Sequence, residues 1–203
     1  MKRLDLKKDL RALYAPSPRE VEMVRVPKLN FLMIDGKGDP NLSPGFALAV
    51  QALYAAAYTL KFMIKKEEAV DYPVMALEGL WWADNLEVFR MEQRDDWKWT
   101  LMIMQPSLVT KARLKKAVAA AMEKKGLDAL RDIRLELYGE GLAVQIMHIG
   151  PYASEGPTIE KLHSFALERG LTLSGKHHEI YLSDPRKVSP GKMKTVLRQP
   201  VRK

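Results

Sequence analysis

Apolar and polar positions alternate along the chain in a way that predicts a recurring order of elements. The first half is predicted to run strand, helix, strand, strand, at residues 29–35, 44–66, 72–82 and 97–105. The first strand ends at the turn-rich run Gly36-Lys37-Gly38-Asp39-Pro40. The last two strands are joined by a polar, charged segment, 83–96, that we expect to form a hairpin loop.

The second half repeats this order. It is predicted to run strand, helix, strand, strand, at residues 142–149, 154–169, 177–184 and 193–201. Ser154 is the predicted N-cap of the helix, Pro157 is tolerated in its first turn, and Gly170 ends it. The apolar stripe of this helix consists of Ile159, Leu162 and Phe165 or Ala166.

Between the halves, Thr110 is predicted to cap an amphipathic helix that runs to Lys125 and ends at Gly126. Residues 132–138 alternate as a strand, which we expect to pair with the strand from Leu142 across a glycine turn. A duplicated α+β unit follows, with two pseudo-symmetric modules whose antiparallel sheets are expected to face each other across a pseudo-twofold axis. We expect a single domain over 1–203, with these parts: leader 1–28, first module 29–109, linking helix and strand 110–141, second module 142–203.

Composition narrows the class of protein. Apolar residues make up 47% and charged residues 29% of the 203 residues, as in ordinary globular proteins. The chain has no cysteine, which excludes disulfides and thiol catalysis and favours a reducing compartment. Residues 1–18 are charged throughout and lack the apolar run of a secretory signal. We therefore expect a cytoplasmic protein.

Hydropathy raises the possibility of a membrane protein and net charge that of a nucleic-acid-binding protein, and the sequence favours neither. The most apolar stretch, 46–64, is interrupted by polar residues and is interpreted as a buried helix rather than a membrane span. The net charge of +8 raises nucleic acid as a partner. Much of the excess lies on the predicted helix 110–125 and in 186–203, and no nucleic-acid motif accompanies it. A solvated basic face is favoured over direct nucleic-acid binding.

Duplication also has a chemical consequence. Aligning the third elements of the two halves sets Glu78 opposite Glu179, and both acids stand in otherwise apolar or aromatic strands. If the two modules face each other, two carboxylates and a set of aromatic rings are expected to converge on one cleft. The expected partner is a small aromatic or amphipathic molecule.

Several runs of residues resemble those of a known family. The C-terminal run 178–186 (HEIYLSDPR) followed by 194–201 (KTVLRQPV) is similar to the closing signature of the GyrI-like small-molecule-binding proteins. The run 30–41 (NFLMIDGKGDPN) resembles their opening strand, and 78–82 (EGLWW) resembles the middle of the standalone branch of the family. The resemblance covers residues from about 5 to 203.

This resemblance implies two strand-helix-strand-strand modules with a concave ligand groove. The same domain is the drug-sensing half of multidrug-responsive transcription regulators, which place a helix-turn-helix region upstream. Here only about 28 residues precede the first strand, which disfavours a regulator that acts alone. In the standalone branch with the double tryptophan, the resemblance implies a cyclopropanoid cyclopropyl hydrolase. Such enzymes open the spirocyclopropane of DNA-alkylating compounds such as yatakemycin within an aromatic cage.

That chemistry needs a stacked substrate, a hydrogen-bond donor at its carbonyl and a water held at the ring methylene. Candidate cage residues are Trp81 or Trp82, which alternate faces of a strand, and Tyr152, Tyr58 and Tyr181. Core packing is the alternative for Trp81 and Trp82, and it is favoured for the stripe of Tyr54, Tyr58 and Phe62.

Polar candidates complete the expected site. Glu179 is predicted to orient or deprotonate the attacking water, with Glu78 as its counterpart, and Tyr152 or His148 to donate to the carbonyl oxygen. Burial among rings and the second carboxylate would raise the pKa of one glutamate. A structural role in an ion pair is the alternative for both acids.

Other kinds of site find little support. His177 and His178 point to opposite faces of one strand, and no spaced set of metal ligands, phosphate loop or nucleophile elbow is present in the sequence. No cofactor is indicated. His163 is predicted to be solvated on the polar side of its helix. Two further functions stay open: a drug-binding protein without catalysis, with Glu179 as counter-ion, and a topoisomerase inhibitor that uses an outer surface.

Overall fold

The structure is a computed structural model that describes residues 1–83 and 94–203. The predicted hairpin loop 83–96 therefore lies largely outside the described residues. The chain forms two compact units. Unit 1 comprises 1–9, 29–77 and 81–138, and unit 2 comprises 10–28, 78–80 and 139–203.

Unit 1 is built on long antiparallel strands. Its strands are β1 (Lys2–Arg3), β3 (Leu29–Lys37), β4 (Val70–Asp71), β6 (Lys98–Gln105), β7 (Arg134–Tyr138) and part of β5 (Leu77–Trp82). β3 pairs with β6 on one side and with β7 on the other. The strand β1 pairs in parallel with β4. Its helical segments are α1 (Leu6–Asp9), α3 (Pro44–Glu68), α4 (Lys111–Lys125) and the 3₁₀ helices Arg94–Asp96 and Asp128–Asp132.

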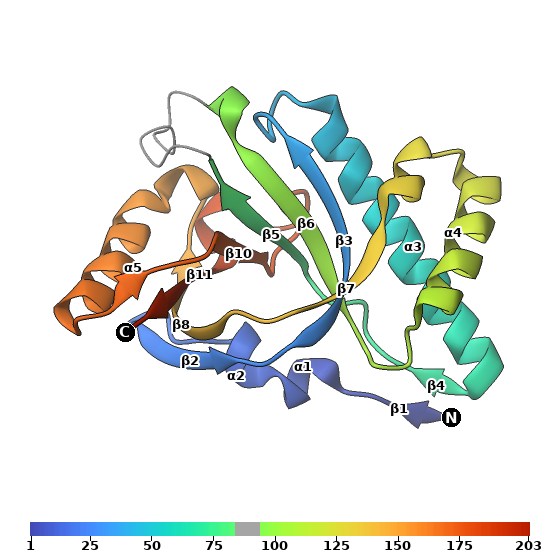
Figure 1. Cartoon of the computed structure of the whole chain (residues 1–203), viewed down its shortest axis with the longest axis horizontal. Coiled ribbons are helices and arrows are strands. Elements are labelled where there is room, and N and C mark those ends of the chain that lie inside the picture. Colours follow the sequence, from blue (N-terminus) through green and yellow to red (C-terminus); the bar gives the residue numbers. More distant parts are fainter. Residues whose placement is uncertain (84–93) are drawn as a thin grey trace. The chain divides into compact units, whose positions relative to one another are not determined.

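The helix α3 packs against β3 and β6, and α4 lies beside it (Figure 1). Its buried side is rich in small residues, which allows a close approach to the sheet: Ala49, Ala52, Leu53, Ala56, Ala57, Leu60 and Ile64. α3 is also long and apolar enough to cross a membrane by length and composition alone. That helix nevertheless carries seven fully or nearly buried residues in the fold of unit 1, as the sequence predicted for a core helix.

Unit 2 contains part of the large antiparallel sheet and one main helix. Its strands are β2 (Glu22–Val26), β8 (Gly141–Ile149), β9 (Thr172–Leu173), β10 (His177–Tyr181), β11 (Lys194–Arg202) and residues Glu78–Leu80 of β5. The order is β2-β8-β11-β10-β5, and β9 pairs with β11. Its helical segments are α2 (Arg11–Tyr14), α5 (Gly156–Glu168) and the 3₁₀ helices Tyr152–Ser154 and Pro190–Lys192.

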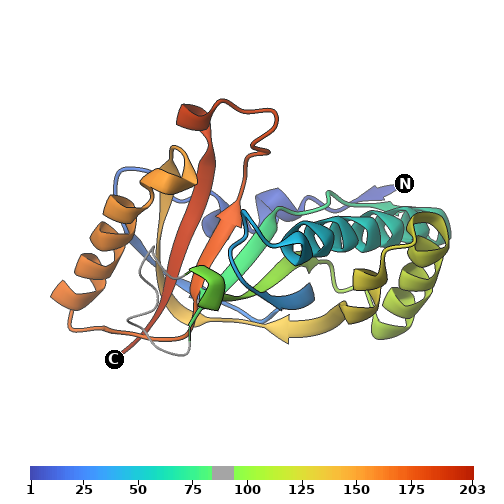
Figure 2. The same ribbon diagram turned by 90° about the horizontal axis from the view of Figure 1, so that it is seen from above.

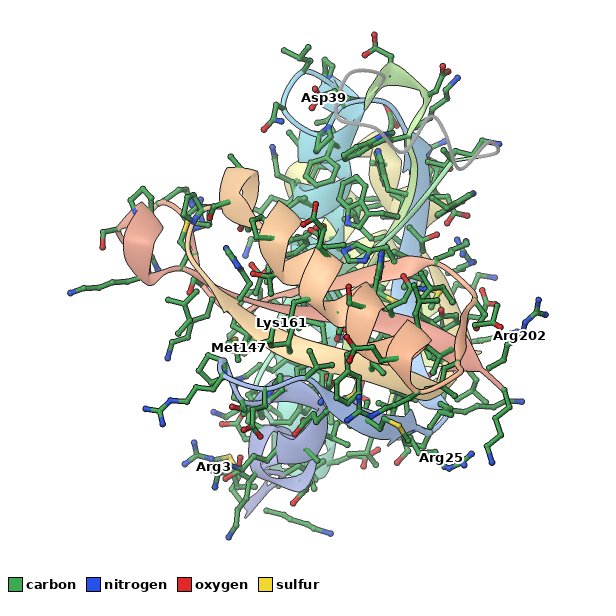
Figure 3. The ribbon with its side chains drawn as sticks, turned by 90° about the vertical axis from the view of Figure 1, so that its left-hand side faces the viewer. Arg3, Arg25, Asp39, Met147, Lys161 and Arg202 are labelled. Carbon is green, nitrogen blue, oxygen red and sulfur yellow. The ribbon has the colours of Figure 1, made fainter. Side chains whose placement is uncertain are left out.

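The helix α5 covers one face of this sheet (Figure 2). Figure 3 views unit 2 with α5 in front and Lys161 on that helix, and Lys161 donates to the Arg19 carbonyl at 2.5 Å. Beneath the helix, Leu162 and Ala166 pack into a core with Ile159 and Phe165 beside it. This is the predicted apolar stripe. The rest of that core comes from the strands and the segments next to them: Val21, Val144, Ile146, Leu171, Leu197 and Val201.

Much of the predicted order is confirmed. Apart from the two-residue strands β4 and β9, the elements β3, α3, β5 and β6, and then β8, α5, β10 and β11, give strand, helix, strand, strand twice. The fold is α+β with a large antiparallel sheet. Thr110 caps α4 by accepting a hydrogen bond from the Arg113 amide at 3.2 Å. Gly126 ends that helix with a left-handed φ of 63°, which glycine adopts at little cost.

Three local expectations differ from the structure. β7 pairs with β3, and not with β8, because β2 and β11 occupy both edges of β8. Residues 1–28 are more than a leader, because α2 and β2 belong to the fold of unit 2. Ser154 does not cap α5: its hydroxyl donates to the Pro151 carbonyl at 2.8 Å, and the helix starts two residues later. The predicted division of the chain at 29, 110 and 142 stays a prediction.

Candidate functional site

Glu78 is enclosed in unit 2 by two polar partners. The Tyr14 hydroxyl donates to its Oε1 at 2.6 Å, and its Oε2 lies 3.0 Å from His178 Nε2. The Glu78 side chain is 1% exposed. A carboxylate closed off in this way is a structural acid, because a ligand could reach it only by breaking buried hydrogen bonds.

The same network continues on the other side of His178. His178 Nδ1 lies 3.1 Å from Glu140 Oε2, and that oxygen also accepts a hydrogen bond from Arg198 at 3.1 Å. Arg198 further donates to the side chain of Gln145 and to the main-chain carbonyl of Leu13. The buried network thus ties the N-terminal segment with α2 to the strands β8, β10 and β11.

Charge pairing fixes the protonation of this network. Burial by itself would lower the pKa of His178, but the charges and hydrogen bonds of Glu140 and Glu78 outweigh it and raise the pKa to about 9. Burial would likewise raise the pKa of Glu140, but His178 and Arg198 hold it below its usual value. His178 is therefore an imidazolium between two acids at neutral pH.

Glu179 lies on the other face of β10 from His178, since neighbouring side chains of a strand alternate. The Tyr181 hydroxyl donates to Glu179 Oε2 at 2.7 Å, and His177 Nε2 lies 3.5 Å from Oε1. The expectation that Glu78 and Glu179 converge on one cleft is therefore wrong. Glu78 faces the His178 network, whereas Glu179 belongs to the face covered by α5.

Aromatic side chains accompany Glu179, as expected. The ring of Tyr152 meets that of Tyr181 edge-on, with centroids 5.6 Å apart. The Glu179 side chain keeps 17% of its exposure, and Tyr152 is 42% exposed. A carboxylate with two tyrosines beside it thus stays within reach of a ligand.

A row of polar side chains crosses three strands beneath the start of α5. Tyr181 on β10 stands opposite Thr195 on β11, and Thr195 stands opposite His148 on β8. His148 Nδ1 lies 2.9 Å from Thr158 Oγ1, and its Nε2 lies 3.2 Å from Ser154 Oγ. The predicted site residue His148 therefore anchors the first turn of α5 to β8 through its contacts with Thr158 and Ser154. It lies on the same face of the strands as Glu179.

Glu155 was not singled out in the sequence and belongs to the same cluster. It is 5% exposed, directly follows the 3₁₀ helix that carries Tyr152, and immediately precedes α5. Burial, followed by the charge of Glu179, raises the pKa of its carboxyl to about 9, against the opposing influence of the Thr195 hydroxyl. The raised pKa that the sequence led us to expect from a carboxylate pair thus falls on Glu155, with Glu179 as its partner.

Unit 1 contains an aromatic cluster around Trp81. Trp81 is 4% exposed, stacks on Phe46 with centroids 6.0 Å apart, and meets Trp97 edge-on at 5.9 Å. Phe46 in turn meets the buried ring of Trp99 at 5.2 Å. Trp82 is half-buried. Both Trp81 and Trp99 pack in the unit 1 core, and the part of Trp81 or Trp82 in ligand binding stays a prediction.

The tyrosine stripe of α3 is not core. Tyr58 is 48% and Phe62 is 59% exposed, and their rings stack with centroids 6.4 Å apart. The core interpretation of these two residues is wrong, because they project from the side of α3 opposite its buried alanines. The predicted ligand contact of Tyr58 stays a prediction.

The histidines of unit 2 differ in part from expectation. His163 is half-buried rather than solvated: burial and the neighbouring His177 lower its pKa, and Gln199 acts in the opposite direction. His177 and His178 face opposite sides of β10, as predicted. Within residues 1–83 and 94–203, no group of three or more acidic or histidine ligands is placed to hold a metal ion.

Comparisons with known proteins agree with this architecture. A family profile described as GyrI-like small molecule binding domain matches residues 19–202. An uncharacterized conserved protein from Listeria innocua is 44% identical, with a TM-score of 0.91, and the alignment covers 98% of this chain and 100% of that chain. Two structures of a hydrolase from the same organism are each 42% identical. Their TM-scores are 0.85 and 0.88, with 98% and 99% of this chain and 100% of each of those chains covered. A search of curated proteins gave no significant match.

Proposed function

Because this chain belongs to the GyrI-like small-molecule-binding domain family, we propose that it binds a flat aromatic molecule beside Glu179 and hydrolyses it. The proposed substrate is a dienone with a spiro-fused cyclopropane, the reactive group of DNA-alkylating cyclopropanoid compounds. The two hydrolase structures from Listeria innocua support an enzymatic role. The proposed biological role is detoxification, and the proposed location is the cytoplasm.

The observation that carries this proposal is the setting of the Glu179 carboxylate. One oxygen accepts the Tyr181 hydroxyl at 2.7 Å, while the side chain keeps some exposure among rings. The hydrogen bond fixes the direction of the carboxylate. A fixed, reachable carboxylate beside aromatic rings is suited to hold a water molecule against a stacked ligand.

The reaction balances with one water. The water oxygen forms a bond to the ring methylene, and the bond between that methylene and the spiro carbon breaks. The electron pair of the broken bond enters the six-membered ring, which becomes aromatic, and the dienone oxygen becomes a phenol oxygen. Glu179 takes a proton from the water, and the phenol oxygen gains a proton. Such acid-base assistance is worth about 10²–10⁴-fold in rate.

A second candidate function rests on the same contacts. A carboxylate with tyrosine rings beside it is also a suitable site for an organic cation, which the carboxylate neutralises and the ring faces attract. Glu179, Tyr152 and Tyr181 would then bind a cationic drug without changing it. The two functions differ in one respect: only the hydrolase forms a product.

Turnover of yatakemycin by the purified protein tests the proposal. The wild type should convert the compound to its hydrated, ring-opened product. Glu179→Gln keeps the size of the side chain but removes the base, so its turnover should fall by about 10²–10⁴-fold with a melting temperature no lower than that of the wild type. Glu160→Gln, an exposed acid on α5, is the matched control and should behave as the wild type.

Two other outcomes would decide against hydrolysis at this site. Saturable binding without product over hours would favour the drug-binding function. Full turnover by Glu179→Gln would show that another residue serves as the base. Trp82→Ala and Tyr58→Ala, made separately, measure whether either predicted ligand-binding residue of unit 1 lowers the affinity.

A further inference from the structure

The proposed hydrolysis uses a proton at the ligand carbonyl, and the described structure offers a second carboxyl near Glu179 that the function above leaves unused. Glu155 stands where the 3₁₀ helix Tyr152–Ser154 passes into α5. Its side chain is buried, and its Oε1 has no hydrogen-bond partner among the residues that the structure describes. A buried polar atom without a partner is costly unless a ligand or water meets it.

The backbone around Glu155 holds it firmly in place. Its carbonyl accepts the amides of Thr158 and Ile159, each at 2.9 Å, so the residue is built into the first turn of α5. The same turn is fastened to β8 through His148, which lies within hydrogen-bonding distance of Thr158 and Ser154. Glu155 is thus carried by a rigid element, as a residue with a defined chemical role requires.

The surroundings of Glu155 also favour its neutral form. A helix N-terminus ordinarily stabilises a negative charge. Here burial and the charge of Glu179 act against that tendency and raise the pKa of the Glu155 carboxyl to about 9. No hydrogen bond joins the side chains of these two glutamates in the structure, so the pair is not a closed acid dimer. Glu155 is the carboxyl with the raised pKa, and the Glu179 carboxylate accepts the Tyr181 hydroxyl.

We propose that Glu155 is the proton-donating partner of Glu179: its carboxyl binds a carbonyl oxygen of the ligand and protonates that oxygen as the cyclopropane opens. Glu179 removes a proton from the attacking water, so the two carboxyls exchange roles during one turnover. Transfer of that proton from Glu179 back to Glu155 restores the starting state. The inference rests on the proposed function and deepens it, because it makes a carbonyl acceptor a requirement for the ligand.

Infrared spectroscopy tests the protonation without any ligand. At neutral pH the wild type should show the C=O stretching band of a protonated carboxyl. Glu155→Gln should lose this band, whereas the control Glu160→Gln should keep it. A wild type without the band, or a band that persists in Glu155→Gln, would overturn the proposal.

Binding of an inert carbonyl compound tests the donor role. The probe is a dimethyl cyclohexadienone, which has the dienone carbonyl but no strained ring. Its carbonyl stretch should shift to lower frequency on the wild type and on Glu160→Gln, and Glu155→Ala should lose that shift. An equal shift on a folded Glu155→Ala, or no binding to the wild type, would contradict carbonyl recognition by Glu155.

Turnover of the parent spirocyclopropyl cyclohexadienone completes the test. Glu155→Gln can donate a hydrogen bond but cannot transfer a proton, so kcat should fall by about 10²–10⁴-fold while KM changes little. An unchanged kcat would overturn the inference. Absence of turnover in the wild type, with both infrared results as expected, would refute the hydrolysis and leave Glu155 as the carbonyl-binding residue of a binding protein.

Discussion

At the scale of single residues, Glu78 and Glu179 look equivalent in the sequence and have different surroundings in the structure. Each is an acid in an apolar strand, but Glu78 is enclosed by Tyr14, which lies 64 positions earlier in the chain. A hydrogen bond over that separation has no local signal. Glu155 escaped notice for a related reason, because an acid at the start of a helix is ordinarily a solvated residue that stabilises the helix end.

The burial of Glu155 has a measurable effect on stability. Its pKa is raised to about 9 in the fold, whereas an unfolded glutamate titrates near about 4.3. Between these values the folded protein binds more protons than the unfolded chain, so stability falls as the pH rises. Glu155→Gln removes this dependence and should raise the free energy of unfolding at pH about 8 by at least about 1 kcal/mol. Urea denaturation measures it, and an equal loss of stability with rising pH in both proteins would contradict the burial of a proton at Glu155.

Gly36 is required for packing in unit 1. It stands opposite Trp99 in the β3–β6 pairing, and a Cβ at this position would come within 2.1 Å of the Trp99 ring. Gly36→Ala forces the ring out of place and should cost about 1–3 kcal/mol, the usual range for overpacking. In Gly191→Ala, the matched control, the new Cβ meets no atom within 4 Å. Chemical denaturation of the two variants gives the comparison, and equal stabilities would show that Trp99 adjusts freely.

At the scale of elements, local pattern predicts what local contacts decide. The small-residue face of α3, the Thr110 cap of α4 and the Leu162 stripe of α5 are all visible in a short window of sequence. Strand pairing cannot be predicted from a short window in the same way, because several strands compete for each strand edge. The segment around Glu22, predicted to be part of a leader, takes the edge of β8 that the sequence led us to reserve for residues 132–138.

Within unit 2, the hydrogen bond from Tyr14 to Glu78 joins the N-terminal segment with α2 to β5. Tyr14→Phe removes the donor and leaves a buried carboxylate oxygen without it, which should lower the free energy of unfolding by about 1–3 kcal/mol. Tyr58→Phe, at an exposed ring, is the control and should have little effect. Hydrogen exchange should show faster opening of α2 and β2 in Tyr14→Phe, and unchanged exchange would contradict this fastening role.

At the scale of the whole molecule, buried ionisable groups should determine how stability depends on pH. The pKa of His178 is raised to about 9 in the fold, against about 6.5 in an unfolded chain. Its stabilising contribution is complete below the unfolded value and is lost as the pH rises through about 9. The lowered pKa of Glu140 acts at the other end, where its contribution is lost as the pH falls.

The melting temperature of the wild type should therefore fall as the pH rises from about 6.5 to about 9. His178→Gln removes one source of this slope and should flatten it, with a lower melting temperature at neutral pH. The control is His163→Gln, whose histidine has a lowered pKa and so cannot contribute to a fall of stability in this range. A slope that is as steep in His178→Gln as in the wild type would contradict the imidazolium in the buried network.

The family could be predicted from short motifs, whereas the chemistry depends on side chains brought together by the fold. Glu179 and Tyr181 share one strand face and could be paired from their two-residue spacing. Tyr152 and Glu155 join them only because the chain before α5 reaches Tyr181 on β10 and the helix packs on β8 and β11. For this reason Glu179 could be predicted as a site residue from the sequence, whereas Glu155 could not.

Hydrolysis at Glu179 is tested most directly by mass spectrometry of yatakemycin after incubation with the protein in heavy-oxygen water. Hydrolysis assisted by Glu179 predicts a product with one added water whose new oxygen is labelled, and unlabelled protein. Unchanged yatakemycin after hours with the wild type would contradict hydrolysis by this protein. A labelled Glu179 carboxyl would contradict the role of Glu179 as a base, since that would show attack by the carboxylate and an ester intermediate.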